Sequence, residues 1–174
     1  MNAHEELKQQ FTGLILLTGV DKPGLAASFF ESLSPFTISI IDIEQIVIGD
    51  RLILTTLISL NPAHQSAIEV DLDQCAKSLD VDIATIFESR ASYQAKTELL
   101  KVCVTAEKLT PKDIFFIASV ISDSGGNIES ISRYPSADLK IHFLCSGLTI
   151  NQTRQSFEQI KFEYLATISI EENI

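Results

Sequence analysis

GLILLTGVDKPGLAASFFESL, residues 13–33, is the segment from which the architecture of this chain can be worked out. It begins as an apolar strand and passes through a loop with a Pro-Gly pair. Leu25, Phe29 and Leu33 then follow at the spacing of one helix face. A strand, loop and helix of the same kind occupy residues 98–121, ELLKVCVTAEKLTPKDIFFIASVI. We therefore expect a duplicated unit that opens with a strand and a helix.

The segments that follow each strand and helix repeat as well. Residues 37–60 predict two strands joined at Gly49-Asp50, where a glycine in first position favours a type II′ hairpin turn. An amphipathic helix over residues 68–79 and a strand over 81–87 complete the order β-α-β-β-α-β. The second half ends in the same order, with two strands, a helix and a strand over residues 127–134, 139–146, 150–160 and 164–170.

Two anchor pairs place the copies in one register. Pro23 aligns with Pro111 and Ser39 with Asn127, and both pairs lie 88 residues apart. Two βαββαβ units predict an α+β fold of two ferredoxin-like sandwiches, each an antiparallel four-stranded sheet with both helices on one face. The predicted boundaries are an N-terminal tail over residues 1–11, a first domain over 12–89, a linker over 90–96 and a second domain over 97–172.

The second strand of each unit lies at a sheet edge in this topology, and in the first unit it is long and apolar (residues 39–49, SIIDIEQIVIG). An unpaired apolar edge invites pairing. We therefore expect the sheets to join edge to edge, either within one chain or between the chains of a homodimer. The apolar side chains change parity after Ile43, which predicts a bulge near Gln45 unless both faces of the strand are covered.

The composition excludes several classes of partner. The chain has 13 Lys and Arg against 23 Asp and Glu, a net charge of −10. A surface this acidic repels phosphate backbones and anionic lipids, so we expect neither nucleic acid nor membrane as a partner. The apolar runs fall short of the roughly 18 residues of a membrane span, and the N-terminus has no signal-peptide core. Three scattered cysteines predict reduced, packed thiols and hence a cytoplasmic protein.

The residues at the start of the chain resemble a known family. GVDKPG (residues 19–24) followed by DIEQIVIGDRL (residues 42–52) is similar to the amino-terminal region of phosphoserine phosphatases that carry two ACT domains. The resemblance covers roughly residues 12–172, with a specific match in the first repeat and a looser one in the second. It implies an amino-acid-binding allosteric module of L-serine biosynthesis, with serine as the first ligand and glycine as the second.

The resemblance also implies what this sequence lacks. A phosphatase domain would begin with a strand ending in D-x-D-x-T and would hold Mg²⁺, and no such segment occurs here. Asp71 and Asp73 fall in a helical stripe and Asp80 and Asp82 in a turn, so we expect four solvated carboxylates. We expect no catalytic residue, no cofactor and no metal in this chain, because its three histidines are isolated from other ligands.

Two other functions fit the same sequence. A free-standing tandem ACT regulator would act by binding a protein partner, as the resemblance to glycine-cleavage-system repressors implies. A structural dimerisation domain would bind no ligand at all.

The loop at residues 21–25 has two interpretations. Backbone N–H groups at the start of the helix could bind a carboxylate, and the missing Cβ of Gly24 would let a ligand approach the backbone. Asp21 could cap the helix or hold an ammonium group. The alternative is a well-formed turn that needs no ligand. The predicted ligand contacts in this loop are Asp21, Lys22, Pro23, Gly24 and Leu25.

The second repeat differs at both equivalent places. Its loop has Lys112 where the first has Gly24, but Gly125-Gly126-Asn127 precedes its second strand where the first repeat has Thr37-Ile38-Ser39. An Asn side chain both donates and accepts hydrogen bonds. The resemblance implies that an Asn at this strand start contacts the ligand, whereas a plain turn is the alternative.

These differences predict one composite site. If the repeats pair through their edge strands, Gly24 with Asn127 would form a competent site, and Lys112 with Ser39 a degenerate one. The further predicted ligand contacts are Ser39, Gly126, Asn127 and Ile128. We expect His142 to face solvent and Arg51 to be a surface cation.

Overall fold

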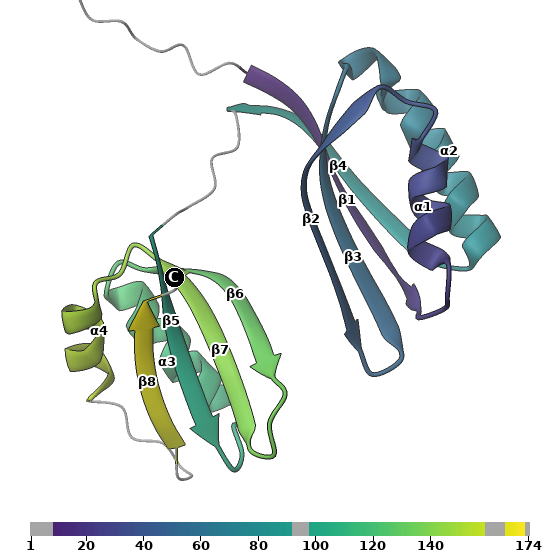
Figure 1. The fold of residues 1–174 in the computed structure, drawn as a ribbon. Coiled ribbons are helices and arrows are strands. Elements are labelled where there is room, and N and C mark those ends of the chain that lie inside the picture. Colours follow the sequence, from purple (N-terminus) through teal and green to yellow (C-terminus); the bar gives the residue numbers. More distant parts are fainter. Residues whose placement is uncertain (1–8, 92–97, 159–165, 173–174) are drawn as a thin grey trace, which may run out of the picture. The chain divides into compact units, whose positions relative to one another are not determined.

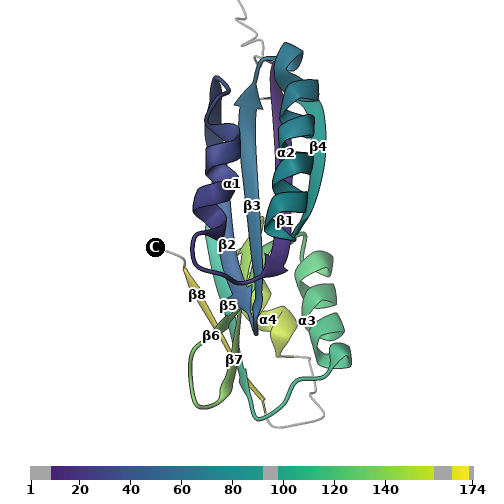
Figure 2. The same cartoon turned by 90° about the vertical axis from the view of Figure 1, so that its right-hand side faces the viewer.

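The computed structural model describes residues 9–91, 98–158 and 166–172. The chain divides into two compact units, Met1–Gln94 and Ala95–Ile174. Each unit is an antiparallel four-stranded sheet covered on one face by two helices, as Figures 1 and 2 show for α1 and α2 of the first unit. This arrangement confirms the predicted pair of ferredoxin-like sandwiches.

The first unit follows the predicted order, with its four strands arranged as β2-β3-β1-β4. Its elements are β1 (Gln9–Val20), α1 (Leu25–Leu33), β2 (Ile38–Ile48), β3 (Arg51–Leu60), the short 3₁₀ helix η1 (Pro62–His64), α2 (Gln65–Leu79) and β4 (Asp82–Ala91). Gly49 and Asp50 form a two-residue connection between the paired Ile48 and Arg51. The positive φ of Gly49, 64°, is that of the first position of a type II′ turn.

The second unit repeats this arrangement in the strand order β6-β7-β5-β8. Its elements are β5 (Leu99–Ala106), α3 (Pro111–Asp123), β6 (Asn127–Tyr134), β7 (Leu139–Ser146), α4 (Ile150–Phe157) and β8 (Ala166–Glu172). The predicted linker, residues 90–96, lies largely outside the described residues. Its first two residues, Arg90 and Ala91, belong to β4 instead.

One buried stripe per unit, apolar except at Asp113, fixes the helix layer on the sheet. Leu25, Phe29 and Leu33 are buried on α1, and Asp113, Ile117 and Ile121 occupy the matching positions of α3, each 88 residues later. The stripe of α1 packs on Ile15 and Leu17 of β1, and that of α3 packs on Val102 and Val104 of β5. The register predicted from the two anchor pairs is therefore the register of the cores.

The edge strands carry matching irregularities, but not where the sequence predicted. In β2 the pairing shifts between Ile40 and Asp42, so the extra residue is Ile41 and the prediction of a bulge near Gln45 is wrong. In β6 the shift falls between Ile128 and Ser130, which makes Glu129 the extra residue, again 88 positions later. Apolar side chains after the bulge lie on both faces of β2, which explains the change of parity.

The burial of the helix stripe can be tested in the first unit. Phe29 is fully buried, so Phe29→Ala is expected to lower the free energy of unfolding by about 3–5 kcal/mol through lost burial and a cavity. Phe115→Ala is the matched control, because Phe115 is 63% exposed on α3 and its loss should change stability by no more than about 0.5 kcal/mol. Urea unfolding followed by circular dichroism measures both. Equal losses would contradict the assigned core.

Candidate functional site

The glycine loop of the first unit is a β-turn that sets the start of α1. Pro23 and Gly24 are its central residues, and the N–H of Leu25 donates to the carbonyl of Lys22 at 3.2 Å. Gly24 has φ 87° and ψ −6°, the values that the third residue of a type II turn requires. A Cβ at Gly24 would meet nothing within 4 Å, so there is space for a side chain. The positive φ is therefore the reason that this position favours glycine. Leu25 points into the core.

Asp21 does not cap the helix, which removes one of its two predicted roles. Gly24 is the N-cap, and no side chain accepts a hydrogen bond there. The backbone N–H of Asp21 instead donates to the carbonyl of Asp50 in the β2–β3 hairpin at 2.8 Å. Among the described residues, no acceptor reaches the N–H groups of Ala26 and Ala27. These groups are open donors at the positive end of the helix dipole.

The corresponding loop of the second unit is closed by its own side chains. Thr110 is the N-cap of α3 and forms a capping box with Asp113. The N–H and the hydroxyl of Thr110 both donate to Asp113 Oδ2 at 2.7 Å. Helix α3 begins two residues earlier than α1 relative to the core stripe, and Lys112 lies within its first turn. An anion therefore has less access to backbone donors here than at α1.

The start of β6 is shaped by the way α3 ends. Gly125, with φ 81°, donates its N–H to Ser122 O, and Gly126 donates to Ile121 O, both at 2.9 Å. This pair of bonds is a Schellman motif, so the two glycines have a structural reason to be there. A Cβ on Gly126 would lie 2.5 Å from a Leu148 side-chain carbon. The motif delivers Asn127 to the first, exposed position of the strand.

Glu129 is a polar residue of this region that the sequence analysis missed. As the extra residue of the β6 bulge, it accepts a hydrogen bond from Asn127 Nδ2 at 2.8 Å and another from the hydroxyl of Ser146. Its signal in the sequence is slight, a single acid two residues after Asn127. In the first unit Ser39 is exposed on β2 and lies opposite Ser59.

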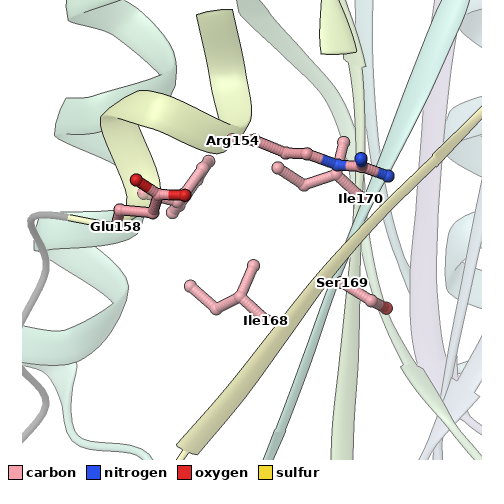
Figure 3. A pocket seen from close by; sticks show the side chains of 6 residues that line it. Arg154, Glu158, Ile168, Ser169 and Ile170 are labelled. Atoms are coloured by element: carbon pink, nitrogen blue, oxygen red, sulfur yellow. The ribbon is translucent and has the colours of Figure 1, made fainter. Parts of the chain in front are cut away.

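Three cavities stand out among the described residues, and none of the predicted site residues lines any of them. A cavity of about 430 Å³ lies between α4 and β8, where Figure 3 shows Ile168 pointing towards α4 while Ser169 points to the other side of the strand. One of about 400 Å³ lies at the end of β1, lined by Arg51, Lys77 and Asp82 among others. The largest, about 530 Å³, is a groove between α1 and α2. The loop and the start of β6 are open surfaces within their own units.

The aspartates that mimic a phosphatase motif have ordinary structural positions. Asp71 and Asp73 lie on α2, where Asp73 forms an exposed ion pair with Lys77 one turn away. Asp80 caps the end of the helix with φ 56°, and Asp82 begins β4. No three His, Cys, Asp or Glu side chains of the described residues come together as a possible metal site.

Two titratable groups of the second unit are perturbed. Burial, with the charge of Glu129 nearby, raises the pKa of the Cys145 thiol to about 11. All three cysteines are free and buried. His142 lies on the helix-free face of the sheet, half-buried and stacked on Tyr134, rather than fully facing solvent. Burial and then the charges of Lys140 and Lys101 lower its pKa, against an opposing effect of Glu171.

The comparisons with known proteins first define a class. Residues 12–85 match the family model described as the ACT domain. The first unit is therefore an ACT domain, and the second repeats its strand order and its bulge. A crystal structure assigned as a glycine cleavage system transcriptional repressor has a TM-score of 0.74 at 17% identity, over 95% of this chain and 99% of that one. A protein from Galdieria sulphuraria gives 0.75 at 14% identity, over 96% and 100%. Both confirm the fold.

Two relatives are more specific in sequence. The phosphoserine phosphatase of Streptomyces coelicolor is 29% identical over 150 residues, 82% of this chain and 35% of the relative. Phosphoserine phosphatase SerB2 of Mycobacterium tuberculosis is 27% identical over 133 residues, 74% of this chain and 32% of the relative. This chain thus spans about a third of the length of the curated relatives it matches.

No helix in the described part of the chain is long and apolar enough to cross a membrane.

The positive φ of Gly24 predicts the order of stability of two variants. Gly24→Ala should lower the free energy of unfolding by about 1–2 kcal/mol, because a Cβ is strained at positive φ. Gly24→Asn should cost less, since Asn tolerates the left-handed region better. Thermal unfolding of the two variants beside the wild type measures the order. An alanine variant as stable as the wild type would show that the turn does not need this torsion.

The lowered pKa of His142 makes stability depend on pH in one direction. The unfolded chain takes up this proton at higher pH than the folded one, so the contribution of the neutral imidazole is complete above pH 6.5 and is lost as pH falls below it. Wild type should therefore lose more thermal stability between pH 7.5 and 5.5 than His142→Gln. Parallel losses in the two proteins would contradict the perturbation.

Proposed function

We propose that this chain is an amino-acid-sensing regulatory module of a phosphoserine phosphatase, with serine as its first ligand and glycine as its second. The observation that carries the proposal is the alignment of 82% of the chain with 35% of a longer phosphoserine phosphatase. A regulatory module needs no catalytic group of its own. We also propose a cytoplasmic location, which the three free, buried cysteines support.

The chemistry of the ligand follows from the groups that the two units expose. The open N–H groups of Ala26 and Ala27 suit a carboxylate. The start of β6, with Asn127 beside the carboxylate of Glu129, suits an ammonium group. The proposed ligand contacts are Asp21, Lys22, Pro23, Gly24, Leu25, Ser39, Gly126, Asn127 and Ile128. Leu25 contributes through its place in the turn, because its side chain is buried.

The proposed route to regulation is a shift between arrangements of the ACT domains. Pairing of the apolar β2 edge, as in a homodimer, would complete the site. Ligand binding would then stabilise the paired arrangement. A ligand that binds one arrangement better changes its population by its differential affinity, commonly about 1–3 kcal/mol. An attached phosphatase domain, which would hold the Mg²⁺, would sense that change.

A free-standing regulator is the second candidate. The structure assigned as a glycine cleavage system transcriptional repressor is covered over 99% of its chain by this one, which supports this candidate. Such a regulator would act on a protein partner. Sequencing the gene beyond codon 174 for a strand ending in D-x-D-x-T separates the two candidates.

A thermal-shift screen of the twenty amino acids tests the proposed function. Serine, and more weakly glycine, should raise the melting temperature. At a ligand concentration 100 times the dissociation constant, the stabilisation would be about 2.7 kcal/mol. Amino acids with large apolar side chains serve as controls and should have no effect. Absence of any shift with all twenty would favour a purely structural dimerisation domain.

A further inference from the structure

The start of β6 holds one side chain in a defined orientation. The Schellman motif fixes the backbone before Asn127, and the Leu148 side chain occupies the space that a Cβ on Gly126 would need. Asn127 lies directly opposite Ser146 on β7. Because the bulge turns the following strand, the side chain of Glu129 reaches back to both members of this cross-strand pair.

The contact with Glu129 determines which end of the Asn127 amide is left to accept a hydrogen bond. An ionised carboxylate only accepts hydrogen bonds, so the amide nitrogen must be the end that faces Glu129 Oε1, at 2.8 Å. The same nitrogen lies 3.4 Å from the carbonyl oxygen of Ile128. Its two hydrogens are thereby directed to Glu129 and to the backbone of Ile128, both at the surface. Asn127 is exposed, and no donor of the described residues reaches its amide oxygen Oδ1.

The first unit shows that the bulge alone does not produce this arrangement. Its β2 strand has the same bulge, but the extra residue is Ile41. The residue that matches Asn127 is Ser39, the second residue of the strand, and the residue opposite it is Ser59. An isoleucine accepts no hydrogen bond, so nothing there orients a polar side chain. The oriented amide is a property of the second unit.

We propose that Glu129 is a positioning residue that fixes the Asn127 amide as a hydrogen-bond acceptor for the ammonium group of a ligand amino acid. This inference rests on the proposed function. It adds the physical reason why the site would select an amino acid. The start of β6 presents an amide oxygen that no donor of the described residues reaches, on a side chain whose nitrogen is held by a carboxylate, so it favours a cationic donor over a carboxylate. The site therefore distinguishes an α-amino acid from the α-hydroxy acid of the same shape.

Calorimetry on the full chain with L-serine and with glycerate, which has a hydroxyl in place of the ammonium, tests this selectivity. The wild type should bind serine at least tenfold more tightly than glycerate. Glu129→Gln keeps the size of the side chain but can present its own amide in either orientation. It should weaken serine binding about tenfold or more and leave glycerate binding nearly unchanged. Glu69→Gln, the same exchange at an exposed position of α2 in the first unit, is the matched control and should change neither.

A second measurement tests the orientation of the Asn127 amide in the absence of a ligand. The side-chain NH₂ resonances of Asn127 in ¹⁵N spectra should move as Glu129 is titrated with acid, and should be insensitive to the same titration in Glu129→Gln. Circular dichroism establishes that the variants remain folded.

The outcomes separate the inference from the proposed function. Failure of the wild type to bind any amino acid overturns both. Serine binding that survives Glu129→Gln with its preference over glycerate intact overturns the role of Glu129 and leaves the proposed function standing. NH₂ resonances of Asn127 that ignore the titration of Glu129 also overturn it.

Discussion

The burial of one helix stripe against one sheet face is the constraint on which both units depend. Leu25, Phe29 and Leu33 in the first unit, and the residues 88 positions later in the second, lock each first helix at the same height on its sheet. With the helix body fixed, the two copies can differ only at its ends. They do so by using a turn with a positive φ at Gly24 in one case and a Thr110–Asp113 capping box in the other. The cores are alike, and the chemistry diverges at the helix starts.

This division explains how much could be predicted from sequence. Strand order, edge positions and the hairpin at Gly49-Asp50 follow from periodicity and turn chemistry, and all are present. The agreement of two anchor pairs was sufficient to align cores that share few identical residues. Patterns that depend on repeated local contacts are visible in a single sequence.

The features that could not be predicted from the sequence depend on the register between paired strands. The β2 bulge lies at Ile41 rather than near Gln45, because pairing with Ile58 and Leu57 of β3 sets the shift and the alternation of apolar residues does not. Asp21 looked like a helix cap, but its N–H is used by a hairpin that is 29 residues away in sequence. The role of Glu129 could not be predicted from the sequence, because its partner Ser146 is on another strand.

The bond between the N–H of Asp21 and the carbonyl of Asp50 limits how the first unit can change in evolution. It ties the glycine loop to the tip of a hairpin whose connection has only two residues. An insertion in that connection would displace the loop, so the length of one surface turn is coupled to the position of another. In the second unit four residues, Pro135–Asp138, join β6 to β7. Changes in length should therefore accumulate in the β6–β7 connection before they are tolerated in the β2–β3 hairpin.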